Sequence, residues 1–88
     1  MYIVIEYYQP TMGGYVKKAK VCNGYTSAYM TMQKWYNERM AKWGITEIDE
    51  FNGYFGYLDD YDGQLYNDHS DIMYKYFLTE ETEDEDDE

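Results

Sequence analysis

The first residues of the chain alternate between two faces with a period of two. Residues 2–8 are β-branched or aromatic apart from Glu6, and their alternation places Ile3 and Ile5 on one face and Val4 and Glu6 on the other. A strand has this period, because successive side chains of an extended backbone point to opposite sides. The pattern predicts a β-strand over residues 2–8.

A second alternating segment follows after a short break. In residues 15–22, Ala19 and Val21 lie opposite Lys18 and Lys20. Between the two segments, a proline fixes one backbone angle and two consecutive glycines tolerate positive φ, which is typical of a turn. The sequence therefore predicts a β-hairpin, and Asn23-Gly24 ends its second strand.

The period then changes to three and four residues, which predicts an amphipathic helix over residues 26–44. Thr26 or Ser27 is the expected N-cap, because a side-chain hydroxyl can accept a bond from a free N–H of the first turn. Gly44 is the expected left-handed C-cap. The predicted buried face consists of Tyr29, Met32, Trp35 or Tyr36, Met40 and Trp43.

The second half of the chain contains weaker strand patterns. Residues 51–58 are aromatic but interrupted by two glycines, residues 64–67 form only a short candidate strand, and residues 71–78 alternate clearly. Asp62-Gly63 is a hairpin-turn signal, since both residue types tolerate positive φ. The resulting order ββαβββ predicts an α+β fold, in which the N-terminal hairpin and the C-terminal strands form an antiparallel sheet packed on one helix.

Composition divides the chain into a body and an acidic end. Residues 80–88 contain eight acids among nine residues, so they have no apolar surface to offset the entropy of ordering; we expect one domain over residues 1–79 and a disordered tail over 80–88. The 7 Lys and Arg against 18 Asp and Glu give a net charge of −11. This charge disfavours direct binding to nucleic acid or an anionic membrane, and it favours a basic partner.

The single cysteine and the N-terminal sequence bear on the compartment. Cys22 alone excludes an internal disulfide and any zinc site with several cysteines. The N-terminus has neither a basic region nor an apolar run long enough for export or for spanning a membrane. We expect a cytoplasmic protein.

Several catalytic or cofactor sites can be tested by spacing, and none fits. If Gly63 is position 6 of a calcium loop, position 1 is Leu58 and position 12 is His69, whereas an EF-hand requires Asp and Glu there. His69 has no second His or nearby Cys to complete a zinc site, and Cys22 has no local nucleophile signature. Phosphate-binding glycine loops and nucleophile elbows are also missing from the sequence. The sequence predicts no enzyme and no cofactor.

The only basic cluster admits two interpretations. Lys17, Lys18 and Lys20 beside Tyr15 could hold a single strand of RNA or DNA. Three lysines are few for that purpose, and the acids elsewhere oppose the approach of a polyanion. We favour the interpretation that these lysines solubilise an exposed strand edge or attract the acidic tail.

Tyrosines and acids alternate in the second half of the chain. The 13 Tyr among 18 aromatics exceed what a core of this size needs, and tyrosine offers a large contact area with a polar end. Rings and carboxylates that share one end of the domain would suit a partner rich in arginine. The alternative is that tyrosine replaces phenylalanine in a small core and the acids only keep the protein soluble. The interleaved residues are Tyr54, Tyr57, Tyr61, Tyr66, Tyr74 and Tyr76 with Asp59, Asp60, Asp62, Asp68 and Asp71.

A carboxylate display can occupy a surface that evolved to hold phosphates. In size, acidity and tyrosine content the chain resembles the small phage-encoded inhibitors of host defence, the DNA-mimic and anti-CRISPR proteins. The resemblance implies a non-enzymatic inhibitor whose partner is a Cas nuclease or another nucleic-acid enzyme. The expected phosphate surrogates are Asp59, Asp60, Asp62, Asp68 and Asp71, the expected anchors are Tyr57, Tyr61 and Tyr66, and residues 80–88 would steer association. The alternative function is a structural or adaptor module that binds through its aromatic helix or a strand edge.

Overall fold

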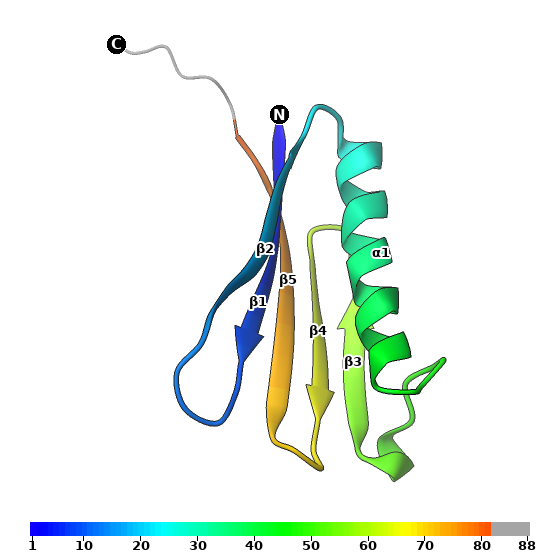
Figure 1. Ribbon diagram of the computed structural model, residues 1–88. Coiled ribbons are helices and arrows are strands. Elements are labelled where there is room, and N and C mark those ends of the chain that lie inside the picture. The colour runs from blue at the N-terminus through cyan, green and yellow to red at the C-terminus, as the bar shows by residue number, and fades with distance from the viewer. Residues whose placement is uncertain (82–88) are drawn as a thin grey trace.

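The computed structural model describes residues 1–81 and shows one helix lying along a five-stranded antiparallel sheet (Figure 1). The predicted α+β class and the order ββαβββ are confirmed. The elements are β1 (Tyr2–Gln9), β2 (Tyr15–Cys22), α1 (Tyr25–Lys42), the 3₁₀ turn η1 (Glu50–Asn52), β3 (Tyr54–Leu58), β4 (Asp62–Asn67) and β5 (Ile72–Glu80).

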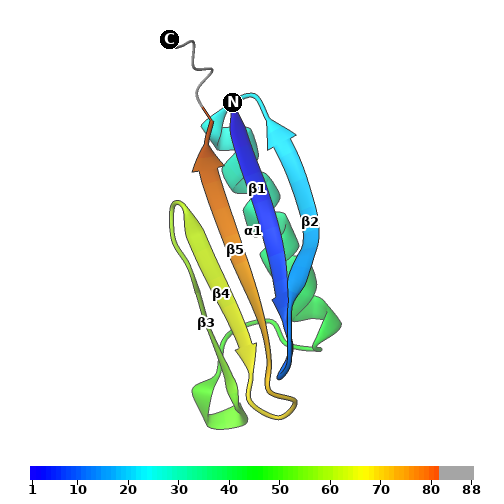
Figure 2. The same ribbon diagram turned by 90° about the vertical axis from the view of Figure 1, so that its left-hand side faces the viewer.

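The strands lie in the order β2-β1-β5-β4-β3, so the first and last strands of the chain pair at the centre of the sheet. The β1–β5 register runs from Tyr2 opposite Glu80 to Gln9 opposite Met73. Figure 2 shows α1 behind the sheet, which leaves the other face of the sheet uncovered. This arrangement makes β2 and β3 the edge strands, as the lysine-rich sequence of β2 suggested.

The core lies between α1 and the covered face of the sheet. Alternation places Val4 of β1, Leu65 of β4 and Tyr76 of β5 on this face, where each is fully buried. Burying one such side chain contributes about 1.5–3 kcal/mol. The buried hydrophobic residues are Val4, Cys22, Ala28, Met32, Tyr36, Met40, Leu65, Tyr74, Tyr76 and Leu78.

The helix packs on the sheet through its predicted buried face, and its C-terminus is capped as expected. Met32, Tyr36 and Met40 are buried against the sheet. Gly44 has φ 79° and donates to the carbonyl of Ala41, while the next residue donates to the carbonyl of Met40. These two bonds form a Schellman motif, which satisfies the last free carbonyls of the helix.

The predicted N-cap of the helix is wrong. The helix begins at Tyr25, one residue earlier than predicted, so Gly24 occupies the N-cap position and no side chain caps the helix. Thr26 and Ser27 therefore lie inside the first turn. The ring of Tyr25 stacks on Tyr29, with centroids 6.1 Å apart. This early aromatic contact accounts for the shift, because it places Tyr25 within the packed face of the helix.

The predicted turn at Asp62-Gly63 is also wrong, because these residues begin β4 and the turn comprises residues 59–61. Gly63 pairs with Leu58 across the hairpin, and a Cβ at position 63 would lie 2.7 Å from Leu58 Cδ1. Glycine is needed here for close packing and not for a positive φ. Upstream, the strand predicted over 51–58 begins only at Tyr54, because η1 precedes it and ends at Gly53 with φ 86°.

Two residues that we predicted to belong to the disordered tail, Glu80 and Glu81, are instead held against the first strand. Glu80 belongs to β5, and the backbone N–H of Glu81 donates to the carbonyl of Met1 at 2.8 Å. Pairing with the first strand orders these two acids despite their charge. Residues 82–88 lie outside the described residues. Over residues 1–81, the structure contains no helix that is both long and apolar enough to cross a membrane.

Candidate protein-binding site

The acids of the second half form two groups, separated by the length of β4. Asp59, Asp60 and Asp62 surround the β3–β4 turn, whereas Asp68 and Asp71 lie in the β4–β5 turn at the other end of the strand. The expectation that they share one end of the domain is therefore wrong, because β4 itself separates them. Its six residues at about 3.3 Å each span about 20 Å. Both groups nevertheless flank the same β3–β4 hairpin (Figure 1).

The β3–β4 turn presents two exposed carboxylates beside an aromatic ring. Asp59 and Asp60 are exposed, and Tyr61 is 57% exposed. The Tyr61 ring contacts Tyr25 at a centroid distance of 5.5 Å. The hydroxyl of Tyr25 donates to the carbonyl oxygen of Asp60 at 2.8 Å, which ties the turn to the first turn of α1. The ring and the carboxylates are thus held on an anchored turn.

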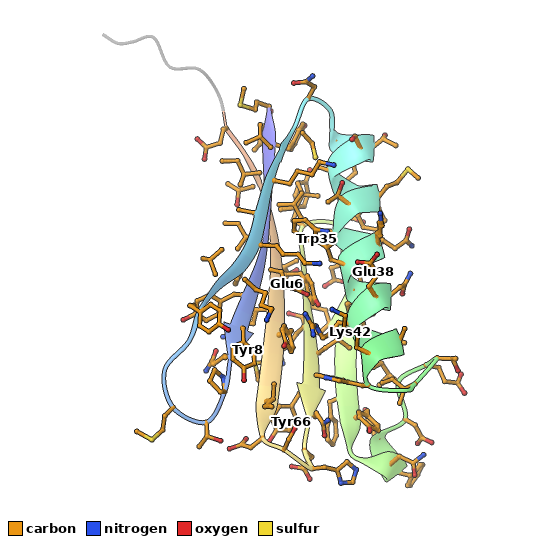
Figure 3. All side chains as sticks on the ribbon, viewed as in Figure 1. Glu6, Tyr8, Trp35, Glu38, Lys42 and Tyr66 are labelled. Atoms are coloured by element: carbon orange, nitrogen blue, oxygen red, sulfur yellow. The ribbon has the colours of Figure 1, made fainter. Side chains whose placement is uncertain are left out.

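The β4–β5 turn contains a more connected carboxylate. Tyr66 donates its hydroxyl proton to Asp71 Oδ1 at 2.9 Å, and Asp68 Oδ1 lies 3.4 Å from the same hydroxyl. The hydroxyl of Thr11, from the β1–β2 loop, donates to Asp71 Oδ2 at 3.2 Å. Figure 3 shows Tyr66 at this end of the sheet. Asp71 has φ 56°, a left-handed conformation that Asp tolerates better than most residues.

A second phenol–carboxylate pair lies at the opposite end of the hairpin. Tyr57 donates to Asp62 Oδ2 at 2.9 Å, and the hydrogen bond to Asp62 raises the pKa of Tyr57. In the same way, the hydrogen bond to Asp71 is the main reason that the pKa of Tyr66 rises to about 12. Both phenols remain protonated at neutral pH and fix the carboxylates as acceptors. Each carboxylate has about four lone-pair positions, so acceptor sites remain for a partner.

Tyr57 and Tyr66 point away from the helix, whereas three other tyrosines of the predicted surface set do not. Tyr54 lies on the helix side, with its ring centroid 6.0 Å from that of Trp43. Tyr74 and Tyr76 are buried beneath α1. Burial, together with the hydrogen bond to Glu6, raises the pKa of Tyr76 far above its usual value. For these two residues, the interpretation of tyrosine as a core residue is the correct one. The sequence shows that these tyrosines alternate with Phe77, which is exposed. It does not show which of the two faces the helix covers.

A buried charged cluster beneath α1 was missed by the sequence analysis. Arg39 Nη2 lies 3.6 Å from Glu6 Oε1, and the hydroxyl of Tyr76 donates to Glu6 Oε2 at 2.6 Å. The guanidinium carbon lies 4.0 Å above the ring of Tyr74. Figure 3 shows Glu6 between the sheet and the helix. Glu6 shares a strand face with Val4, but the alternation does not indicate that this face, and not the face of Ile3 and Ile5, is the buried one.

The two residues considered for catalysis lie far apart. Cys22 is buried and pairs with Tyr2 at one end of the sheet, with its sulfur 3.8 Å from the hydroxyl of Thr31. His69 lies in the β4–β5 turn at the other end, where its Nε2 is 2.6 Å from the carbonyl oxygen of Asn52. They do not form a nucleophile–base pair. In the part of the chain that the structure describes, no three His, Cys, Asp or Glu side chains could hold a metal ion.

The lysines of β2 are at the sheet edge opposite the β3–β4 hairpin. Lys18 lies over the ring of Trp35 and 3.9 Å from Glu38, both on α1, and Lys17 lies over the ring of Tyr8. Positive and negative charges are thus separated across the width of the sheet. Because of this separation, the electrostatic potential near the β3–β4 hairpin is more negative than that near β2, a difference that the net charge does not express.

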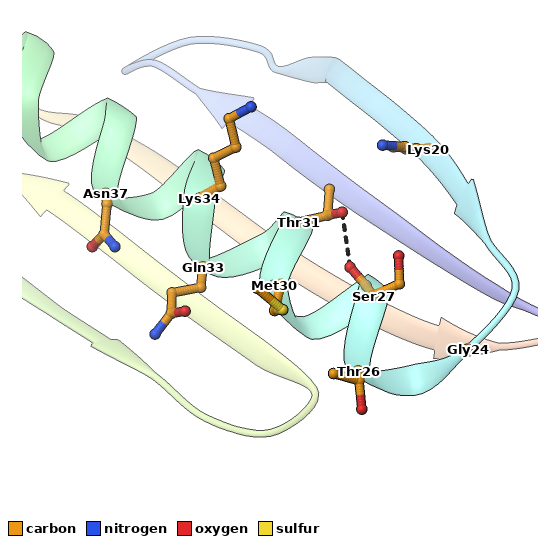
Figure 4. Close-up of a pocket in the computed structure, with 9 residues that line it drawn as sticks. All are labelled: Lys20, Gly24, Thr26, Ser27, Met30, Thr31, Gln33, Lys34 and Asn37. Carbon is orange, nitrogen blue, oxygen red and sulfur yellow. Dashed lines mark hydrogen bonds between the residues drawn. The ribbon is translucent and has the colours of Figure 1, made fainter.

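An open depression lies on the basic side, between β2 and the first turns of α1 (Figure 4). Lys20 and Lys34 are its only charged lining residues. The hydroxyl of Thr31 donates a hydrogen bond to the carbonyl oxygen of Ser27 at 2.9 Å. Among residues 1–81, the buried polar atoms that lack a hydrogen bond belong to Glu6 and Arg39, which do not line the depression. The residues that line the depression therefore offer no buried, unpaired polar group to bind a ligand.

The β3–β4 hairpin and the adjoining β4–β5 turn, which we together call the acidic hairpin, are therefore the best-defined candidate site. It combines exposed acids, aromatic rings and hydrogen bonds that hold the acids in place. Its interpretation depends on this geometry, because no family model, no curated protein and no solved structure matches the chain.

Proposed function

We propose that the protein is a non-enzymatic inhibitor that binds the basic, nucleic-acid-binding surface of a partner protein through its β3–β4 hairpin and the adjoining β4–β5 turn. The observation that carries the proposal is the pair of phenol–carboxylate hydrogen bonds, Tyr57 to Asp62 and Tyr66 to Asp71. They position acceptors at the two ends of β4 before the partner arrives. Pre-positioned groups lose less conformational freedom on binding, which favours affinity.

The spacing of the acids suits a surface that binds phosphates. The two groups are about 20 Å apart along β4, which is close to six nucleotide steps of 3.4 Å along one strand of a duplex. Within each group, Asp59 and Asp60 or Asp68 and Asp71 supply adjacent negative charges. Arginines that hold phosphates bind carboxylates by the same charge-assisted hydrogen bonds.

The aromatic residues of the hairpin supply apolar contact between the two acidic groups. Phe55 lies beside Tyr66 at a centroid distance of 6.0 Å, and both lie on the uncovered side of the sheet with Tyr57. Such rings stack on guanidinium groups and add buried area. The adaptor alternative through an aromatic helix has less support, because Tyr36 and Trp43 pack against tyrosines of the sheet.

The test is capture of partners from a bacterial lysate at low salt, followed by elution with duplex DNA. The proposal predicts that DNA displaces the captured proteins, since both compete for the same basic residues. Capture of proteins that DNA does not release would contradict mimicry and favour the adaptor function.

Charge-matched variants locate the contact. Asp59→Asn with Asp60→Asn should weaken DNA-displaceable binding by at least tenfold, as expected when charge-assisted contacts are lost. Glu38→Gln with Glu47→Gln removes the same charge outside the hairpin and should change binding by less than about twofold. Equal losses in the two variants would show that net charge, and not the hairpin, drives binding.

A further inference from the structure

Asn23 and Gly24 form the connection between β2 and α1, at the edge of the sheet opposite the acidic hairpin. Both residues are exposed, and Gly24 has an extended backbone with φ −129° and ψ 159°. Figure 4 shows Gly24 where β2 leads into the helix. A Cβ built at Gly24 would have no neighbour within 4 Å, so the space beside this residue is open. The connection is therefore not packed against the rest of the fold.

The backbone N–H of Gly24 takes no part in the backbone hydrogen bonding of the fold. Within residues 1–81 it donates to no backbone carbonyl, whereas the carbonyl of Gly24 accepts the N–H of Ala28 at 3.1 Å. No side chain caps the helix at this end. The Asn23 amide and the Gly24 nitrogen can therefore approach each other without breaking a backbone hydrogen bond. These are the two groups that react when an asparagine followed by glycine loses its amide.

The sequence contains a second Asn-Gly pair, Asn52-Gly53, and there the same groups are held in place. The amide nitrogen of Asn52 donates to Asp49 Oδ2 at 2.9 Å, and the N–H of Gly53 donates to the carbonyl of Glu50 at 3.1 Å. Gly53 is also crowded, because a Cβ at this position would lie 2.8 Å from Nε2 of His69. The chain thus places two identical dipeptides in different surroundings, one open and one hydrogen-bonded.

We propose that Asn23 is a site of spontaneous covalent modification, at which water hydrolyses the side-chain amide, and that the fold protects Asn52 from the same reaction. The backbone nitrogen of Gly24 releases its proton and attacks Cγ of Asn23. The new C–N bond closes a succinimide ring, and the amide nitrogen leaves as ammonia with the released proton. Water then opens the ring at either carbonyl, which gives aspartate or isoaspartate. Glycine favours the attack because it has no Cβ to hinder the nitrogen.

The modification changes the charge on the basic side of the molecule. It replaces a neutral amide by a carboxylate beside Gly24, which lines the depression together with Lys20. The first turn of α1 contains no acidic residue, and a negative charge near a helix N-terminus interacts favourably with the helix dipole. The aspartate product is therefore compatible with the fold. The isoaspartate product instead adds one carbon to the backbone between β2 and α1.

Incubation of the full-length protein at mildly alkaline pH, followed by peptide mapping with mass spectrometry, tests the inference. Trypsin cleaves after Lys20 and Lys34, which separates Asn23 from Asn52. Asn23 should be modified on the order of tenfold faster than Asn52, because two hydrogen bonds must open before attack at Asn52. The rate at Asn23 should rise with pH, since the Gly24 nitrogen reacts after losing its proton. Equal rates at the two asparagines, or no modification of Asn23, would overturn the inference.

Two variants connect the rates to the structure. Gly24→Ala adds a methyl group in open space, at a φ that alanine adopts, and should slow the reaction at Asn23 severalfold while the fold is kept. Asp49→Ala removes the acceptor of the Asn52 amide and should speed the reaction at Asn52 severalfold.

Circular dichroism checks that both variants fold. An unchanged rate at Asn23 in Gly24→Ala would contradict the proposed step, and an unchanged rate at Asn52 in Asp49→Ala would contradict the proposed protection. If Asp49→Ala does not fold, the comparison of the two asparagines in the unchanged protein still decides. Neither substitution lies in the acidic hairpin, so this proposal and the proposed partner binding can fail separately.

Discussion

The guanidinium of Arg39 lies 3.6 Å from the carboxylate of Glu6 between α1 and the sheet, and Glu6 is 1% exposed. The second oxygen of Glu6 accepts the hydroxyl proton of Tyr76. A buried carboxylate in this position depends on both partners, because removal from water is costly for an isolated charge. The cluster links helix and sheet at the centre of the core.

Replacing Arg39→Met should lower the free energy of unfolding by about 3–5 kcal/mol, because it leaves the Glu6 charge buried without its counter-ion. Urea denaturation at pH 7 measures the loss. A loss below about 1 kcal/mol would show that the pair contributes little to the native state.

The double variant Glu6→Gln with Arg39→Met separates charge burial from packing. The glutamine carbonyl still accepts the proton of Tyr76, and no charge remains in the cluster. We expect most of the stability lost in Arg39→Met to return. If the double variant is as unstable as the single one, the lost contact of the guanidinium with Tyr74 and not the uncompensated charge is responsible.

The hydrogen bond from Tyr66 to Asp71 predicts an alkaline titration. The pKa of Tyr66 is about 12 in the folded protein against an ordinary value of 10.0, so the folded state holds this proton more tightly than the unfolded chain. The resulting stabilisation is present below pH 10 and is lost as the pH rises through 12. In Asp71→Asn the pKa of Tyr66 should fall toward 10, as measured by NMR titration of the ring. An unchanged pKa would mean that Asp71 does not hold the phenol.

Gly63→Ala should destabilise the hairpin by about 1–3 kcal/mol, because the new Cβ would lie 2.7 Å from Leu58 Cδ1 and 3.1 Å from the Tyr57 carbonyl oxygen. Thermal unfolding followed by circular dichroism measures the change. The control Gly24→Ser adds a side chain in open space at the helix N-cap, where serine is favoured, and should not destabilise the protein. Equal losses of thermal stability in the two variants would mean that the close contacts at Gly63 do not cause the destabilisation.

The strands and the helix could be predicted because local periodicity determines them. Residues 15–22 were placed with their observed bounds, and Gly44 was identified as the C-cap because only its conformation suits that position. The turn after β3 was predicted at the wrong residues, because Asp62-Gly63 is a local turn signal. In the folded protein, pairing of Gly63 with Leu58 overrides this signal. Pattern alone also could not indicate which face of the sheet the helix covers.

The candidate site could be predicted only in its composition. Asp59 and Asp60 were recognised as exposed acids, and Tyr57 and Tyr66 as surface aromatics. Their division into two groups follows from the antiparallel path of β4, which sequence spacing does not reveal. Asp71, which accepts the bond from Tyr66, has a left-handed conformation in the β4–β5 turn that the sequence pattern does not predict.

The salt dependence of partner binding tests the central claim most directly. A captured partner that duplex DNA displaces is titrated with the full-length protein at 50 and 200 mM sodium chloride. If the carboxylates at the two ends of β4 substitute for phosphates, the dissociation constant should rise by about tenfold or more at the higher salt. A dissociation constant that is unchanged across this range would contradict the account.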